Sequence, residues 1–237
     1  MKKLFPIIVS LLLMFSLAPF AYADEESYEP TFKDVPESYK FFEDIELLTW
    51  DGVISGYKDG TFRPNQSVTR EQAAIMIGRW LDYDGKPQKT IFPDVSPASV
   101  ASGYIQEAVN DGIIQGFKDG TFRPTQTVTR GQMAIFLSRA FDLTEADQVT
   151  FKDVSPSSAA YPYIGKLIHA NITYGYEDGT FKPNLAVTRG QFAAFMNRAI
   201  EFELSQYYDE DWSDEDMDFD QLLEQLEQYQ EQENNHI

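Results

Sequence analysis

The chain has 237 residues, no cysteine and a formal net charge of −19 at pH 7. The lack of cysteine excludes a disulfide framework, a thiol nucleophile and a thiolate zinc site. Fourteen acidic residues and no Lys or Arg lie in residues 201–237, which leaves only −5 for residues 1–200. Because phosphate binding needs a basic surface, nucleic acid is not an expected partner of either part.

Residues 1–23 have the layout of a secretory signal peptide. A positive MKK start is followed by an apolar stretch and by the small residues of Ala21-Tyr22-Ala23, the order that precedes cleavage at export. An uncleaved membrane anchor is the alternative, but Pro6 and Pro19 interrupt the apolar stretch. We therefore expect a secreted protein with no membrane span after cleavage.

Three copies of one unit follow. An FxDV motif begins at Phe32, Phe92 and Phe151, and GYKDGTFRPNQSVTR at 56–70 returns as GFKDGTFRPTQTVTR at 116–130 and GYEDGTFKPNLAVTR at 175–189. A repeat of this kind indicates an array of similar structural units. The predicted repeats are 32–85, 92–145 and 151–203, followed by an acidic tail at 204–237.

Each copy predicts two helices. Apolar spacing places the first over about 39–50, 101–110 and 160–169. The second begins at the sequence TREQ or TRGQ, which matches a capping box with Thr at N-cap and Gln at N3. Because one helical hairpin cannot bury its apolar stripe alone, the three copies should pack into one mainly α domain. The apolar residues of the second helices are the expected core: Ala73, Met76, Ile77, Trp80, Leu81, Met133, Phe136, Leu137, Ala140, Phe141, Phe192, Phe195, Met196, Ala199 and Ile200.

The motifs FxDV, DGxISG(Y/F), DGTF(R/K)P and VTR(E/G)Q together resemble the S-layer homology (SLH) repeat, in its usual tandem of three. The resemblance implies a pseudo-threefold spindle of helical-hairpin repeats, whose grooves bind a secondary cell-wall polysaccharide that commonly carries ketal-linked pyruvate. The family's TRAE motif supplies a groove arginine; this chain keeps its Thr and Arg but not its Ala and Glu. We therefore expect a noncovalent anchor on the wall of a Gram-positive-type bacterium, with cell-wall polysaccharide as partner.

The arginines that start the second helices are the main candidate ligand-binding residues. The first turn of a helix is the positive end of its dipole, which disfavours a cation. An arginine placed there suggests a carboxylate-bearing ligand, and its removal is expected to cost the fold little stability. The alternative is pairing of these arginines, Arg70, Arg130 and Arg189, with the protein's own carboxylates at Asp34, Asp94 and Asp153.

Other candidates surround these arginines. Tyr57, Phe117 and Tyr176 could offer aromatic faces to a sugar, although packing is their alternative role. Gly56, Gly116 and Gly175 could leave room for a ligand near the backbone, and Asp34, Asp94 and Asp153 complete the predicted polysaccharide site. A second set of arginines near the helix C-termini, where a cation is favourable, is predicted to be structural: Arg79, Arg139 and Arg198.

The third repeat departs most from the other two. Tyr174 stands where they have Ser55 and Gln115, and Lys182 replaces two arginines. Steric crowding and the loss of a planar guanidinium predict that the third groove, which we assign to Arg189, binds weakest. The alternative is that Tyr174 adds an aromatic face on which a sugar can stack.

Nothing in the repeats predicts catalysis. His169 and His236 are the only histidines and cannot supply a triad or a zinc site. We therefore expect no enzymatic activity, no cofactor and no metal. The alternative functions are a structural surface-layer subunit and an accessory protein that acts through its acidic tail. The tail is predicted to be disordered, with a short amphipathic helix that could bind an unknown partner through Phe219, Leu222, Leu223, Leu226 and Tyr229.

Overall fold

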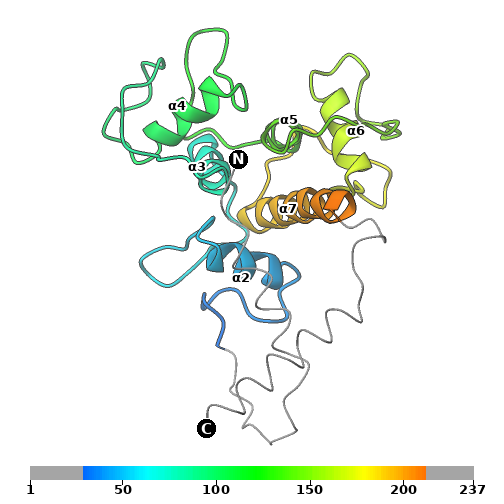
Figure 1. The fold of residues 1–237 in the computed structure, drawn as a ribbon, viewed down its shortest axis with the longest axis horizontal. Coiled ribbons are helices and arrows are strands. Elements are labelled where there is room, and N and C mark those ends of the chain that lie inside the picture. Colours follow the sequence, from blue (N-terminus) through cyan, green and yellow to red (C-terminus); the bar gives the residue numbers. More distant parts are fainter. Residues whose placement is uncertain (1–28, 212–237) are drawn as a thin grey trace, which may run out of the picture. The chain divides into compact units, whose positions relative to one another are not determined.

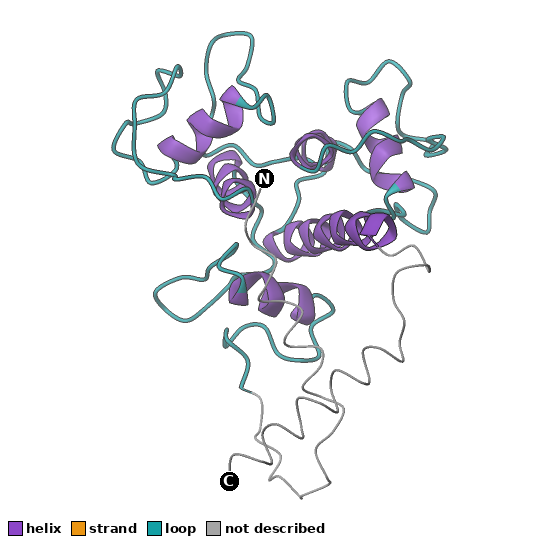
Figure 2. Ribbon diagram, in the orientation of Figure 1, coloured by secondary structure: helices purple, strands orange, loops and turns teal. Residues whose placement is uncertain are grey.

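The computed structural model describes residues 29–211, so the predicted signal peptide and the amphipathic segment at 219–229 lie outside the described residues. The described part is mainly helical and contains no named strand (Figure 2). Each repeat supplies two helices, as predicted. They are α2 (Phe42–Trp50) and α3 (Arg70–Trp80), then α4 (Ser102–Asn110) and α5 (Arg130–Ala140), then α6 (Tyr161–His169) and α7 (Arg189–Asp211).

The second helices begin where the sequence predicts. The hydroxyl of Thr69 accepts the backbone N–H of Gln72, and the Gln72 side chain accepts the N–H of Thr69. The same reciprocal pair caps α5, and Thr188 and Gln191 form it at the start of α7. The capping boxes therefore fix the first turn of all three helices.

Helix α7 is much longer than its counterparts. Asp82 and Asp142, which follow α3 and α5, have left-handed φ angles of 57° and 47°, a conformation that ends a helix. The corresponding residue, Glu201, remains helical, and α7 continues to Asp211. The helix therefore extends beyond residue 204, where the sequence analysis begins the acidic tail.

The helices pack between repeats and close into a cycle. Helix α3 packs against α4, α5 against α6, and α7 against α2 (Figure 1). The second helix of each repeat thus contacts the first helix of the next repeat, and the last repeat contacts the first. Each repeat therefore contacts both of the others, as a pseudo-threefold packing requires.

Extended residues just before the second helices join the repeats at the centre of this cycle. The backbone N–H of Val68 donates to the carbonyl of Val187, that of Val187 to Val128, and that of Val128 to Val68, each at 2.9 Å. All three valines are fully buried. This closed ring of hydrogen bonds makes the three repeats depend on one another.

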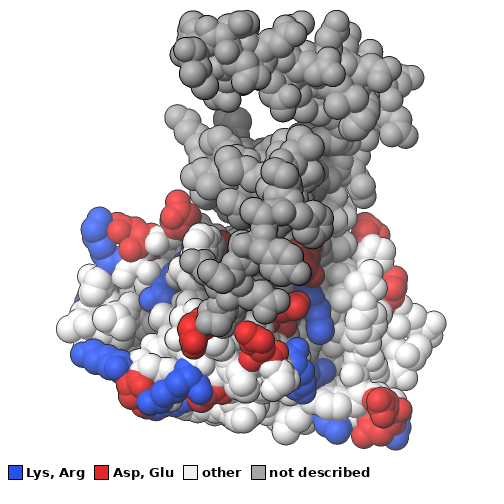
Figure 3. Space-filling view, turned by 90° about the horizontal axis from the view of Figure 1, so that it is seen from below, with Lys and Arg blue, Asp and Glu red and all other residues white. Residues whose placement is uncertain are grey.

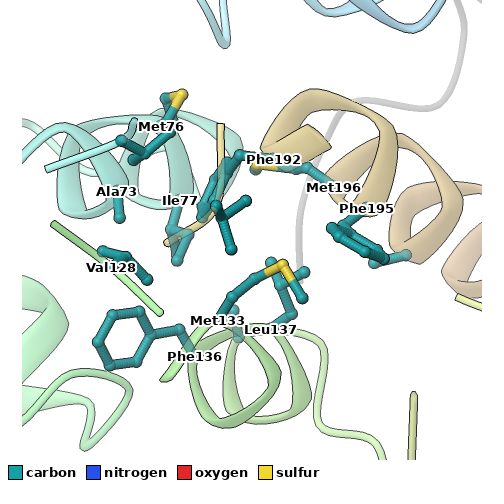
Figure 4. Packing of buried hydrophobic residues seen from close by; sticks show 14 of the residues in the cluster. Ala73, Met76, Ile77, Val128, Met133, Phe136, Leu137, Phe192, Phe195 and Met196 are labelled. Carbon is teal, nitrogen blue, oxygen red and sulfur yellow. The ribbon is translucent and has the colours of Figure 1, made fainter. Parts of the chain in front are cut away.

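The core lies where α3, α5 and α7 converge. Ile77, Met133, Leu137 and Phe192 come from these three helices and point toward one another (Figure 4). Of the predicted core positions, only Trp80 and Leu81 are half-buried rather than buried. The 3.6-residue apolar period therefore identified the core correctly.

Candidate functional site

The arginine at the start of each second helix is buried and reaches into another repeat. Arg70 is 2% exposed, and its Nε donates to the carbonyl of Phe122 while its Nη2 donates to that of Gln115, both at 2.7 Å. Burial, together with the nearby charge of Arg123, lowers the pKa of Arg70 to about 10. The guanidinium therefore stays protonated at neutral pH, and its hydrogen bonds are charge-assisted.

The other two arginines repeat this contact around the ring. Arg189 donates from Nε to Phe62 O and from Nη2 to Ser55 O, both at 2.8 Å. Arg130 donates from Nε to Phe181 O at 2.7 Å. In the part of the chain that the structure describes, none of the three forms an ion pair with the protein's carboxylates. Backbone carbonyls of a neighbouring repeat take the place of the carboxylates considered above.

The aspartates of the FxDV motifs hold the same loop from its other side. Asp94 accepts the backbone N–H groups of Phe122 and Arg123 at 2.9 and 2.7 Å. Arg123 has a left-handed φ of 58°, a conformation that costs a non-glycine residue free energy. Phe122 is thus fixed through its N–H by Asp94 and through its carbonyl by Arg70. The equivalent bonds join Asp34 to Phe62 and Arg63, and Asp153 to Phe181 and Lys182.

The candidate aromatic residues each have two cations close to the ring. The Phe117 ring has the guanidinium carbon of Arg123 at 3.9 Å from its centroid and that of Arg70 at 4.8 Å. Arg123 is also paired within its own loop, because its Nη2 lies 2.8 Å from Asp119 Oδ2. Much of the ring surface therefore serves internal cation–π contacts. The Tyr57 ring lies near Arg63 and Arg189 in the same way. The Tyr176 ring lies near Lys182 and Arg130.

The candidate glycines make room for an aromatic ring rather than for a ligand. A Cβ added at Gly116 would lie 2.2 Å from Cε1 of Phe92, and at Gly56 it would lie 2.3 Å from Cε1 of Phe32. Gly175 stands in the same relation to Phe151. The expectation that these glycines leave room for a ligand is therefore wrong, although Gly175 still lines the groove beside Arg130.

We expect Gly116→Ala to lower the free energy of unfolding by about 1–3 kcal/mol, because the added methyl overpacks the Phe92 ring. Chemical denaturation measures this loss. Phe92→Leu in the same chain removes the clashing atom and should recover part of it. If the losses of Gly116→Ala and Phe92→Leu simply add up in the double variant, Gly116 does not serve to make room for the Phe92 ring.

The structure corrects the assignment of residues to grooves. Tyr174 and Tyr176 lie beside Arg130, whereas Arg189 contacts Ser55, Tyr57 and Phe62 of the first repeat. The substitutions in the third repeat therefore alter the groove of Arg130. The expectation that they alter the groove of Arg189 is therefore wrong.

The groove beside Arg130 has a volume of about 150 Å³ and combines all three repeats. Arg130 comes from the second repeat and Phe41 from the first. The third repeat supplies the loop 173–176 and one face of α7, which includes Arg198. Phe41 was not among the predicted site residues, although the sequence carries one signal for it: the corresponding residues of the other repeats are Ala101 and Ala160.

The chain matches the S-layer homology domain at residues 31–74, 91–134 and 150–193. It is 31% identical to Cell surface glycoprotein 1 of Acetivibrio thermocellus, over 62% of this chain and 7% of that protein. It is 28% identical to the Cellulosome-anchoring protein of the same organism, over 73% of this chain and 39% of that protein. It is 31% identical to an Endoglucanase of Bacillus sp. (strain KSM-635), over 82% and 22%.

The chain belongs to the S-layer homology family. It is a secreted cell-surface protein of the Gram-positive type of bacterium, and its three repeats form a module of the kind that anchors proteins at the cell surface. Its matches span less than two fifths of the length of these relatives. None of the helices in residues 29–211 is long and apolar enough to cross a membrane.

Proposed function

We propose that the ring of three repeats anchors the protein noncovalently to an anionic secondary cell-wall polysaccharide, with pyruvylated sugars as the recognised units. The proposed role is binding without catalysis. Its principal support is the groove beside Arg130, where a buried cation and aromatic side chains meet in one concave site. A guanidinium suits a carboxylate, and aromatic rings suit the apolar faces of a sugar.

The charge distribution favours a local site over general attraction to an anionic wall. Lys and Arg side chains are interspersed with Asp and Glu on the face shown in Figure 3. The outer cations of the three loops are paired with acids four residues away, Asp59, Asp119 and Asp178. Recognition would therefore depend on the arginines in the grooves.

Binding to isolated wall sacculi tests the proposal. The purified protein should co-sediment with sacculi and should remain in the supernatant once hydrofluoric acid has stripped the wall polysaccharide. Equal co-sedimentation with stripped sacculi would point to peptidoglycan and would overturn the proposal.

We expect a chain that ends at Asp211 to bind sacculi as well as the full protein or better. The acidic residues beyond this point repel an anionic wall and lie outside the three repeats, whereas α7 stays complete. Co-sedimentation of the two proteins at equal concentration measures the difference. A large loss of binding in the shortened chain would assign the polysaccharide contact to the tail.

A further inference from the structure

The groove beside Arg130 differs from the other two in several of the residues that line it. Arg130, Tyr176 and Arg198 have equivalents in every groove, and the differences lie at Phe41, Tyr174 and Ala194; we call these six residues the aromatic groove. Phe41 replaces an alanine, and Ala194 replaces the isoleucines at 75 and 135. Tyr174 is 71% exposed and stands where the other loops have Ser or Gln. Of the residues that line this groove, one is therefore smaller than its counterparts, and two are aromatic residues at positions where the other repeats have Ala, Ser or Gln.

The backbone of the third loop also differs. Gly175 has a φ of 73°, whereas its counterparts Gly56 and Gly116 do not have positive φ angles. Thr173, which stands where the other loops have isoleucine, accepts the N–H of Gly175 through its hydroxyl at 3.4 Å. An isoleucine at this position has no hydroxyl and cannot make this hydrogen bond.

This conformation leaves the guanidinium of Arg130 with fewer partners. Nη2 of Arg70 and Nη2 of Arg189 donate to the carbonyls of Gln115 and Ser55. Among the described residues, Arg130 donates only from Nε, and Tyr174 O accepts nothing from it. Yet Arg130 is just 4% exposed and lines the groove. Its other two guanidinium nitrogens have no acceptor in the described protein, and because no buried side-chain nitrogen there lacks a partner, they open into the groove, where an anion can bind them.

A second cation lines the same groove. Within residues 29–211, Arg198 makes one hydrogen bond, from Nη1 to Ile172 O at 3.3 Å. Its counterpart Arg139 also donates to the Tyr163 hydroxyl, and Arg79 also donates to Ser55 Oγ. The guanidinium of Arg198 therefore keeps more donors for a ligand than either counterpart.

We propose that the aromatic groove is the principal saccharide site of the ring. Arg130 and Arg198 bind the carboxylate of an acidic sugar, and Phe41 and Tyr174 contact the apolar faces of the sugar ring. This inference rests on the proposed function and reverses the ranking expected from the sequence, in which the substitutions of the third repeat weaken its groove. The other two grooves contribute less, because their arginines are more fully occupied by backbone carbonyls.

Matched substitutions in two grooves test the inference by titration calorimetry with polysaccharide released from sacculi. Tyr174→Ser installs the residue of the first repeat, and Ala194→Ile installs the isoleucine of the other repeats. Tyr174→Ser should weaken binding by about three- to tenfold, the scale of one lost aromatic contact. Ala194→Ile should weaken it at least as much, because the larger side chain occupies the groove. Gln115→Ser, the matched change beside Arg70, should stay within about twofold of the unaltered protein. Because Tyr174 is exposed, its replacement should leave the thermal unfolding midpoint unchanged.

The outcomes separate the two proposals. Unaltered affinity in Tyr174→Ser and Ala194→Ile, or an equal loss in Gln115→Ser, would overturn the aromatic groove as the principal site while wall anchoring stands. A failure of the unaltered protein to bind the released polysaccharide would overturn the proposed function itself, and the inference with it.

Discussion

Replacing Arg70 or Arg189 with alanine is expected to lower the free energy of unfolding by about 2–4 kcal/mol. Each substitution removes two charge-assisted hydrogen bonds across a repeat boundary and leaves two carbonyls without their donor. It also removes a buried side chain that lies over the ring of Phe122 or Phe62. The position of these arginines in the first turn of a helix predicts little loss of stability, whereas their buried contacts predict a large one.

Arg130→Ala is the matched control for this prediction. Arg130 makes one of these hydrogen bonds rather than two, so its loss of stability should be clearly smaller than that of Arg70→Ala. Denaturant unfolding of the three variants measures the difference. Equal losses of stability at all three positions would contradict the view that Arg130 contributes fewer hydrogen bonds to the fold than Arg70 and Arg189. Unchanged stability in Arg70→Ala would mean that the carbonyl contacts contribute nothing to the fold.

Replacing Asp94 with alanine should have the second largest effect, a loss of about 2–3 kcal/mol. The carboxylate holds two consecutive backbone N–H groups, and one of them belongs to a residue with a left-handed φ. Losing both bonds leaves donors unpaired and releases the strained turn. The loop that this turn supports also carries the carbonyl to which Arg70 binds. The substitution should therefore also weaken the contact between the first and second repeats.

Two further variants make this prediction specific. Asp94→Asn keeps one acceptor oxygen and should retain about half of the stability lost in Asp94→Ala. Asp119→Ala removes a carboxylate of the same loop whose partners in the described structure are the nearby Thr121 and Arg123, and should change stability little. Thermal unfolding followed by circular dichroism compares the three. If Asp119→Ala were as damaging as Asp94→Ala, the effect would come from general charge loss and not from the N–H bonds.

Local features of the fold could be predicted from the sequence because they depend on residues close together in the chain. The Thr and Gln of each capping box are three residues apart, and the apolar period lies within one helix. The partners of Arg70 lie 45 and 52 residues away and are backbone carbonyls. Every residue carries a carbonyl, so no residue type indicates which one an arginine will meet.

The assignment of residues to grooves needed the direction in which the ring closes. Tyr174 and Arg189 lie in the same repeat, yet the ring places Tyr174 beside Arg130 of the repeat before it. The glycine positions, by contrast, carried a usable signal. Phe32 precedes Gly56 by 24 residues, and the same interval separates Phe92 from Gly116 and Phe151 from Gly175. A bulky ring and a glycine at a constant interval in every copy are typical of residues that pack together.

Titration of the protein with released wall polysaccharide, before and after mild acid removes its ketal-linked carboxylates, tests the central claim most directly. The account predicts saturable binding to the intact polysaccharide and a large loss of affinity after the acid treatment, because Arg130 and Arg198 then lose the group that they bind. Equal affinity for the two preparations would contradict recognition of a carboxylate by the buried arginine.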